Sequence, residues 1–335
     1  MKSLVLSLFI MITSLIVGTS CSHFGKKSYD ARLTNFPYPF KVEIYQFKSQ
    51  KQKLEMAYMD LGPKDAEETY ILFHGKNFSG YYWEKIAKLL KDRGHRVIIP
   101  DQIGFGKSSK PEFYQYSLEQ LALNTHGLVQ SLKIQKYHLI GHSMGGMVAT
   151  KFNKLYPNEV EKMILINPIG LEKYLDYVDY KDPQTFYEAE LAKTADKIKA
   201  YQRRNYYNGD WNEQYDQLIE APTGQLYHSD YPLVAWNNAL TYGPIFTNPI
   251  VDDFKEIENP IVLIIGTRDR TGPGRGFKRE GVSYKLGEYQ KLGKEIYKLI
   301  QNGKLIELTD LGHMPQFEDW ERFKPAFLHA LKEIK

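Results

Sequence analysis

Apolar and polar residues follow two different patterns along this chain. From about Val42 to Leu61 they alternate in two runs separated by a polar turn, which predicts a β-hairpin with one buried face. Beyond this region, short stretches are almost continuously aliphatic, which is typical of strands buried on both faces of a parallel sheet. The five clearest are TYILFHG, HRVIIPD, YHLIGHS, VEKMILINP and PIVLIIGTRD.

Helical patterns separate these aliphatic stretches. In YYWEKIAKLLKDRG the apolar residues share one helical face, and Gly94 follows as a terminator. In SLEQLALNTHGLVQSL, Ser117 stands three residues before Gln120, which is the spacing of a capping box. The helix expected over MGGMVATKFNKLYP stops before Pro157. Since strands and helices alternate, we predict an α/β fold with a doubly wound, mostly parallel sheet and flanking helices.

The alternation fails after about residue 170 and resumes near residue 249. The stretch between reads as helices and loops, and it holds 11 of the 25 tyrosines together with Trp211 and Trp236. We interpret residues 171–248 as a helical lid inserted between two parts of the core, residues 22–170 and 249–335. Its aromatic side chains either pack the insert onto the core or line an apolar substrate channel. The sequence leaves both uses open.

The N-terminus has the layout of a secretion signal. Residues 1–21, MKSLVLSLFIMITSLIVGTSC, place one lysine before an apolar run that is too short to cross a bilayer comfortably. We therefore expect export, either to the periplasm or out of the cell. Cys21, the only cysteine, stands where bacterial lipoprotein signals carry an acylated cysteine, although Gly18 departs from the aliphatic residue usual in that motif. A lipid tether on Cys21 and loss of Cys21 with the signal both stay open.

Charge and composition narrow the possible partners. The formal charge of +4 comes from 44 basic and 40 acidic residues, without a basic block interleaved with aromatics, so nucleic acid is not expected as a partner. No cysteine, histidine or carboxylate cluster has metal-ligand spacing, so no metal is expected. The glycine-rich runs GFGKSS and TGPGRG lack the spacing of nucleotide-binding loops. We expect no cofactor.

One serine lies at the junction of a predicted strand and a predicted helix. In YHLIGHSMGGMVATKF, Ser143 stands between Gly141 and Gly145 in the pattern G-x-S-x-G. Glycines permit a tight turn in which the hydroxyl projects outward and the backbone N–H of Met144 faces the same point. A serine hydroxyl becomes a useful nucleophile when a base and oxyanion donors lie nearby. We therefore interpret Ser143 as a nucleophile rather than an ordinary N-cap.

Five short motifs follow one another along the chain, namely FHG at 73–75, DQIGFGKS at 101–108, GHSMGG at 141–146, GTRD at 266–269 and GHMPQFED at 312–319. By these motifs, the chain from about Val42 onward resembles the α/β-hydrolase family. The resemblance implies a nucleophile at Ser143, an acid at Asp269 and a base at His313, in the chain order that this fold uses. It also implies an oxyanion hole formed by the backbone N–H groups of Lys76 and Met144, with Asn77 less favoured than Lys76.

Other residues near these motifs compete for the same roles. Asp252, Asp253 and Asp310 are alternative acids, but only Asp269 directly follows a buried strand. We expect His142 to pack beside the nucleophile. By the same resemblance, Asp101 is expected to brace the oxyanion loop rather than to take part in chemistry.

The resemblance favours cleavage of a small ester or acyl compound by a carboxylesterase-like serine hydrolase. A serine at position 143 argues against relatives that use aspartate there, namely haloalkane dehalogenases and epoxide hydrolases. Lipase, C–C bond hydrolase, lactonase and iminopeptidase activities stay open on the same residues. A different class of function, a non-catalytic ligand-binding protein, is also compatible with the fold, because a fold does not choose its substrate.

Overall fold

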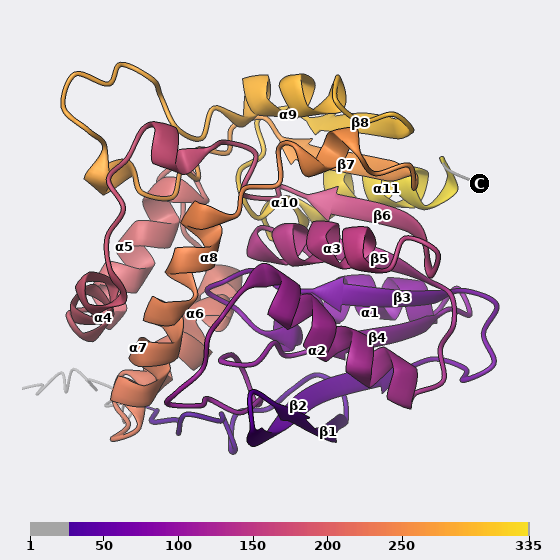
Figure 1. The fold of residues 1–335 in the computed structure, drawn as a ribbon, viewed down its shortest axis with the longest axis horizontal. Helices are drawn as coiled ribbons and strands as arrows, with labels where there is room; N and C mark the ends of the chain where they lie inside the picture. Colours follow the sequence, from indigo (N-terminus) through magenta and orange to yellow (C-terminus); the bar gives the residue numbers. More distant parts are fainter. Residues whose placement is uncertain (1–26, 334–335) are drawn as a thin grey trace, which may run out of the picture.

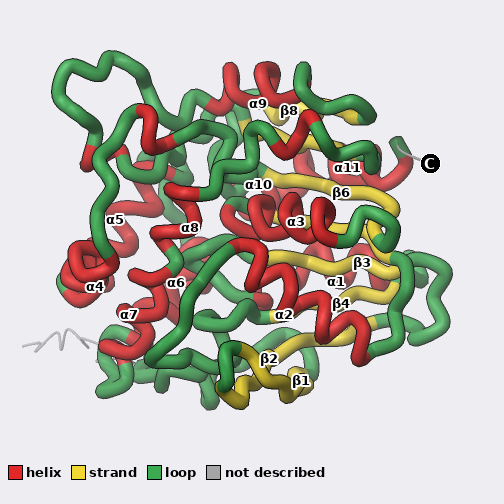
Figure 2. Tube along the Cα trace, viewed as in Figure 1, coloured by secondary structure: helices red, strands yellow, loops and turns green. Residues whose placement is uncertain are grey.

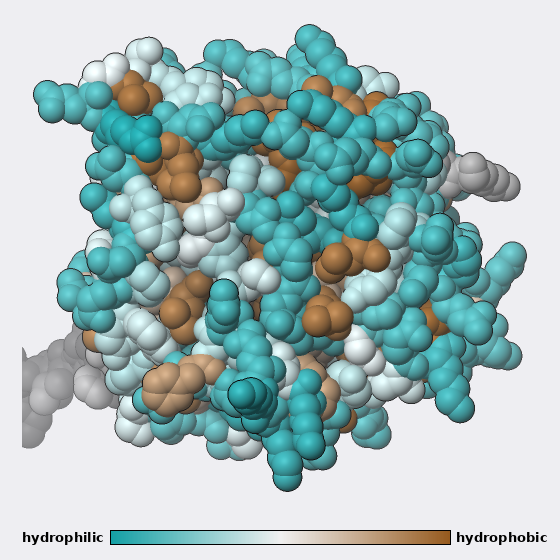
Figure 3. All heavy atoms as spheres, in the orientation of Figure 1, coloured by the Kyte–Doolittle hydropathy of each residue, from teal (hydrophilic) through white to brown (hydrophobic). Residues whose placement is uncertain are grey.

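The computed structural model describes residues 27–333 (Figure 1). The predicted signal and Cys21 lie outside the described residues. Within residues 27–333, no helix is long and apolar enough to span a membrane. Figure 3 shows one face of the molecule, on which apolar residues form small groups separated by polar ones. That face therefore presents no broad apolar surface.

A single eight-stranded sheet forms the centre of the molecule, in the order β1-β2-β4-β3-β5-β6-β7-β8. The first two strands form the predicted antiparallel hairpin, and β2 pairs antiparallel with β4, whereas the remaining pairs are parallel. The predicted mostly parallel α/β sheet is thus confirmed. The strands are β1 (Val42–Ser49), β2 (Gln52–Leu61), β3 (Thr69–Phe73), β4 (Arg96–Pro100), β5 (Tyr137–His142), β6 (Val160–Ile166), β7 (Ile261–Gly266) and β8 (Gly303–Leu308).

Helices cover both faces of this sheet, which is why its parallel strands are aliphatic on both sides. In β3, Ile71 and Phe73 belong to one hydrophobic cluster, whereas Tyr70 and Leu72 belong to the cluster on the opposite face. The first cluster includes residues of α2, α3 and α9, and the second includes residues of α1 and α11. These helices are α1 (Glu84–Lys91), α2 (Leu118–Ser131), α3 (Met144–Leu155), α9 (Tyr289–Tyr297) and α11 (Trp320–Lys332), with the short α10 (Pro315–Glu318) before the last.

Between β6 and β7 the described chain forms helices and no strand of the sheet. In Figures 1 and 2 these helices group together beside the sheet, at the carboxyl ends of the parallel strands. We call them the α4–α8 insert. Several of its tyrosines serve packing, as in the stacked pair Tyr207 and Tyr215, whose ring centroids are 3.6 Å apart. The helices are α4 (Pro183–Leu191), α5 (Ala195–Asn205), α6 (Glu213–Gln225), α7 (Tyr231–Leu240) and α8 (Tyr242–Thr247). The assignment of residues 171–248 as a separate lid stays a prediction.

Residues 27–38 connect this insert to the core, and we call them the N-terminal strap. Tyr29 and Phe36 pack with Ala221 of α6 in a small hydrophobic cluster. The Tyr29 N–H donates to the Gly224 carbonyl at 3.2 Å. On the core side, the Arg32 guanidinium donates to the backbone carbonyl of Lys107 at 2.9 Å. The strap therefore fixes α6 against the loop that follows β4.

Candidate active site

Ser143 occupies a sharp turn between β5 and α3. Its φ is 56° and its ψ is −123°, a conformation that is costly for any residue with a side chain. The turn depends on close backbone packing, because a Cβ added to Gly145 would lie 2.0 Å from the Phe73 carbonyl oxygen. The Ser143 side chain makes no N-cap hydrogen bond to α3. The hydroxyl is therefore available for another partner.

That partner is His313, which in turn contacts Asp269. The His313 Nε2 lies 3.0 Å from the Ser143 Oγ, and its Nδ1 lies 2.7 Å from the Asp269 Oδ2. The three residues follow β5, β7 and β8, so their loops meet at one edge of the sheet. In the tautomer that carries its proton on Nδ1, the ring donates to the carboxylate and Nε2 accepts from the serine hydroxyl.

The environment of Asp269 keeps its carboxylate charged and oriented. Burial by itself raises the pKa of Asp269, but the charge of His313 and the hydrogen bonds from His313 and Thr271 hold that pKa below its ordinary value. The Asn167 amide also donates to the Asp269 Oδ2 at 2.7 Å, while its Oδ1 accepts from the Gly266 N–H at 3.0 Å. The role of Asn167 was not predicted from the sequence, since its only local signal is its place directly after β6.

The competing acids are engaged elsewhere. Asp253 pairs with Lys151 at 2.6 Å, and Asp252 pairs with Lys173 at 2.7 Å. Asp310 lies on the surface with its carboxylate 3.1 Å from Arg268. Of these candidates, the structure brings only Asp269 to His313.

His142 joins two loops of the site through hydrogen bonds. Its Nε2 lies 2.9 Å from the His313 carbonyl oxygen, and its Nδ1 lies 3.0 Å from the Tyr82 hydroxyl. Burial lowers the pKa of His142 to about 3, so the ring is neutral at pH 7. The neutral ring donates from Nε2 to His313 and accepts at Nδ1 from Tyr82, whose oxygen also accepts from the Gly75 N–H at 3.0 Å. This chain of hydrogen bonds links the His313 loop to the loop after β3.

The predicted oxyanion donors lie on both sides of Ser143. A Cβ added to Gly75 would lie 3.1 Å from the Ser143 Cβ, so the backbone leading into Lys76 runs alongside the serine. Within residues 27–333, the backbone N–H groups of Lys76 and Met144 donate to no other protein group, and neither does that of the alternative donor Asn77. These N–H groups are thus free to bind a substrate oxygen.

Asp101 holds the continuation of the same loop. Its Oδ1 accepts from the Gly80 N–H at 2.6 Å, and its Oδ2 accepts from the Lys107 N–H and the Tyr38 hydroxyl, both at 2.7 Å. The carboxylate therefore ties the loop after β3 to the loop after β4 and to the N-terminal strap.

The α4–α8 insert covers His313 with an aromatic ring. The rings of Tyr206 and His313 lie 4.8 Å apart between centroids, and the Asn77 side chain donates to the Tyr206 hydroxyl at 3.1 Å. Packing here is close, because a Cβ on Gly312 would lie 2.0 Å from the Tyr206 carbonyl oxygen. Tyr206 was not singled out by sequence analysis, since nothing distinguishes it from the other tyrosines of the insert.

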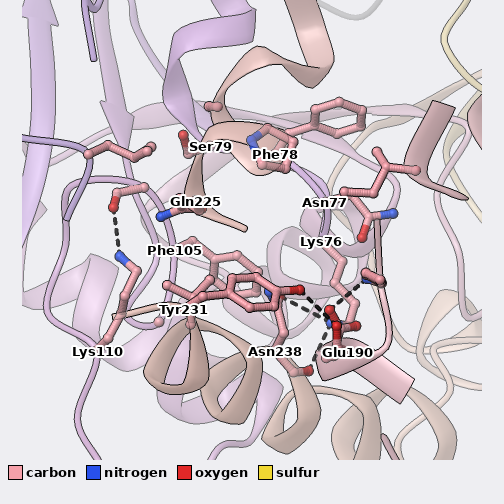
Figure 4. Close-up of a pocket in the computed structure, with 18 of the residues that line it drawn as sticks. Lys76, Asn77, Phe78, Ser79, Phe105, Lys110, Glu190, Gln225, Tyr231 and Asn238 are labelled. Atoms are coloured by element: carbon pink, nitrogen blue, oxygen red, sulfur yellow. Dashed lines mark hydrogen bonds and ion pairs between the residues drawn. The ribbon is translucent and has the colours of Figure 1, made fainter. Parts of the chain in front are cut away.

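A cavity of about 370 Å³ opens between the insert and the loops after β3 and β4 (Figure 4). Lys76 and Asn77 line it, whereas Ser143 and His313 do not. Three tyrosines of the insert, Tyr201, Tyr231 and Tyr242, also line the cavity, so the insert uses its aromatic residues both for packing and for lining. No metal-binding group of three or more histidine, cysteine or acidic side chains occurs in the described part of the chain.

Comparisons with known proteins agree with this fold. A family model described as "alpha/beta hydrolase fold" matches residues 70–276. The chain is similar to Lipase 3 of Moraxella sp., with 32% identity covering 87% of this chain and 90% of the lipase. It is also similar to a proline iminopeptidase of Lactobacillus acidophilus, with 26% identity covering 69% and 85% of the two chains. The crystal structure of a "probable hydrolytic enzyme" from Pseudomonas aeruginosa superimposes with a TM-score of 0.89 at 42% identity, covering 92% of this chain and 99% of that one.

The close packing at the serine turn leads to a prediction for Gly145→Ala. The added methyl would overlap the Phe73 carbonyl, so we expect the free energy of unfolding to fall by about 2 kcal/mol or more. The control is Gly276→Ala, because no atom lies within 4 Å of the position its Cβ would take. Urea denaturation of both variants measures the difference. A Gly145→Ala protein as stable as the Gly276→Ala control would contradict the packing described here.

Proposed function

The chain belongs to the alpha/beta hydrolase fold family, and we propose that it is a serine hydrolase that cleaves carboxylic esters through an acyl-enzyme intermediate on Ser143. The observation that carries this proposal is the hydrogen-bonded series Ser143, His313 and Asp269 at a strained strand-to-helix turn. This is the arrangement that an acyl-transfer nucleophile requires, a hydroxyl beside a base that is itself oriented by a carboxylate.

In the first half of the reaction, the Ser143 Oγ attacks the ester carbonyl carbon. His313 accepts the hydroxyl proton at Nε2, and the charged carboxylate of Asp269 stabilises the imidazolium that results. The carbonyl oxygen becomes an oxyanion, which the N–H groups of Met144 and Lys76 bind. His313 then donates its proton to the alcohol oxygen as the ester C–O bond breaks, which leaves the acyl group on Ser143.

In the second half, water replaces the alcohol. His313 takes a proton from this water as its oxygen attacks the acyl carbon, and the same N–H groups bind the second oxyanion. The bond to the Ser143 Oγ breaks, and His313 returns the proton to that oxygen. The products are a carboxylic acid, an alcohol and the unchanged enzyme.

Lipase activity is the second candidate, because a lipase shares 32% identity with this chain over most of its length. The cavity favours a shorter and more polar acyl group than a lipid chain, since the amino group of Lys76 and the carboxyl group of Glu190 lie among its lining residues. Iminopeptidase, lactonase and C–C bond hydrolase activities use the same kind of site. A panel of substrates distinguishes these activities from ester hydrolysis, and it also distinguishes an enzyme from a non-catalytic binding protein.

We also propose that the protein is exported and that residues 1–21 form its signal. Support comes from the lysine, the short apolar run and the small residues that precede Cys21.

Mass spectrometry of the mature N-terminus from cells of the source organism tests export. Cleavage between Ser20 and Cys21 with an added diacylglycerol and acyl mass is expected if Cys21 carries a lipid tether. Cleavage after Cys21 would leave a secreted or periplasmic protein without the tether. An N-terminus that still begins at Met1 would contradict export.

Hydrolysis of nitrophenyl esters of increasing acyl length tests the catalytic proposal. We expect turnover by the mature protein with an optimum at short chains, and we expect Ser143→Ala to lower kcat/KM by about 10⁴-fold or more. The matched control is Ser131→Ala, which changes an exposed serine at the end of α2 and should keep the wild-type rate.

The same panel includes a proline arylamide, a lactone and a vinylogous diketone. Faster turnover of one of these than of any aryl ester would replace the esterase assignment. A folded protein that turns over none of the compounds would favour the non-catalytic binding protein.

A further inference from the structure

Two lysines are buried in the wall of the cavity without a carboxylate partner. Lys76 and Lys110 are each 8% exposed. Neither ammonium lies within 4.0 Å of an acidic oxygen in the described part of the chain. A buried charge is costly unless an opposite charge lies near it, so these two positions need an explanation.

The groups that do contact the two ammonium ions are neutral. The Lys76 Nζ donates to the Asn238 carbonyl at 2.8 Å and lies 3.9 Å from the centre of the Tyr242 ring. The Lys110 Nζ donates to the carbonyls of Gly106 at 2.6 Å and Ser108 at 3.1 Å. Since an ammonium carries three N–H donors, Lys110 has one left over. These contacts solvate the charges without neutralising them.

The acidic residues that line the cavity are fewer than its lysines. Glu190 is the one acidic residue among the lining residues, and it forms an ion pair with Lys193 at 2.6 Å. Lys197 also lines the cavity. Four lysines and one glutamate therefore line a partly enclosed space, where low-dielectric walls strengthen the field of a charged group. The acidic groups that most favour the charged ammonium, Glu190 for Lys76 and Asp101 for Lys110, lie beyond 4.0 Å from it. Figure 4 shows Lys110 on one side of the cavity and Lys76 with Glu190 on the other.

Burial makes this arrangement costly in the free protein. It lowers the pKa of both Lys76 and Lys110 to about 7, well below the ordinary value of a lysine. A bound anion would favour the charged form of each side chain and recover part of that cost.

We propose that this cavity holds an anionic group of the substrate, a carboxylate or a phosphate, and that the enzyme therefore prefers esters that carry a negative charge on the acyl part. The inference rests on the proposed esterase function, because it concerns the substrate of the same site. Lys76 connects the cavity to the proposed reaction centre, since its backbone N–H belongs to the predicted oxyanion hole while its side chain lines the cavity.

Matched substrates test this preference. The nitrophenyl ester of butyric acid and the nitrophenyl monoester of succinic acid have acyl chains of equal carbon number, and only the second carries a carboxylate. The nitrophenyl ester of 3-phosphonopropionic acid replaces that carboxylate with a phosphonate. We expect wild-type kcat/KM to be at least tenfold higher for one of the charged esters than for the butyrate. The better of the two identifies the preferred anion.

Variants of the lysines separate binding from a structural role. Lys110→Met and, as a second variant, Lys76→Met should each lower the charged-to-neutral ratio of kcat/KM by roughly tenfold, which corresponds to one hydrogen bond to a charged group. Lys110→Arg should retain most of the preference. The control, Lys88→Met, removes an exposed lysine of α1 and should leave the ratio unchanged. A lysine that only braced its loop would change both rates equally when replaced, and this result would overturn the proposal.

Failure of the anion proposal is distinguishable from failure of the esterase proposal. Equal or faster turnover of the butyrate by wild type overturns the anion preference and leaves the esterase intact. If a folded sample cleaves none of the esters, the esterase proposal fails. Calorimetric titration with succinate and with inorganic phosphate then tests whether the cavity binds an anion. Binding that is lost in Lys110→Met supports an anion site, and absence of binding in wild type rejects it.

Discussion

The site depends on how closely helix α3 approaches strand β3. At Gly145 the approach leaves no room for a side chain, because an added Cβ would lie 2.0 Å from the Phe73 carbonyl oxygen. This contact fixes the turn at Ser143 in its left-handed conformation. It also brings the segment after β3, with its free N–H groups, alongside the serine. Ser143 and the N–H groups proposed as oxyanion donors are therefore positioned by one backbone contact.

Around that contact, the other groups of the site are held by buried hydrogen bonds. Asn167 and Thr271 orient Asp269, and His142 links the His313 loop to Tyr82. Because these polar atoms are buried, leaving any of them unpaired would be costly. The same reasoning applies to Lys76 and Lys110, which are buried in the cavity wall with no acidic oxygen within 4.0 Å in the described part of the chain.

Local pattern predicted most of the fold and singled out Ser143, whereas the roles predicted for Asp269 and His313 came from the resemblance to the α/β-hydrolase family. The aliphatic runs identified the parallel strands because burial on both faces leaves a strong signal, and Ser143 was found because its turn requires glycines at fixed positions. Asn167 and Tyr206 were missed because their roles arise from contacts between distant segments. The burial of Lys110 was not predicted either, since the cavity that it lines is formed with residues of the N-terminal strap and the insert, which are distant in the sequence.

The most direct test of the account is labelling with a fluorophosphonate, followed by intact mass measurement and peptide mapping. We expect one adduct per chain, on Ser143. The adduct should form far more slowly in His313→Ala, because the base that activates the hydroxyl is absent. A folded protein that forms no adduct, or that is labelled at another residue while Ser143 stays free, would contradict the assignment of Ser143 as the nucleophile.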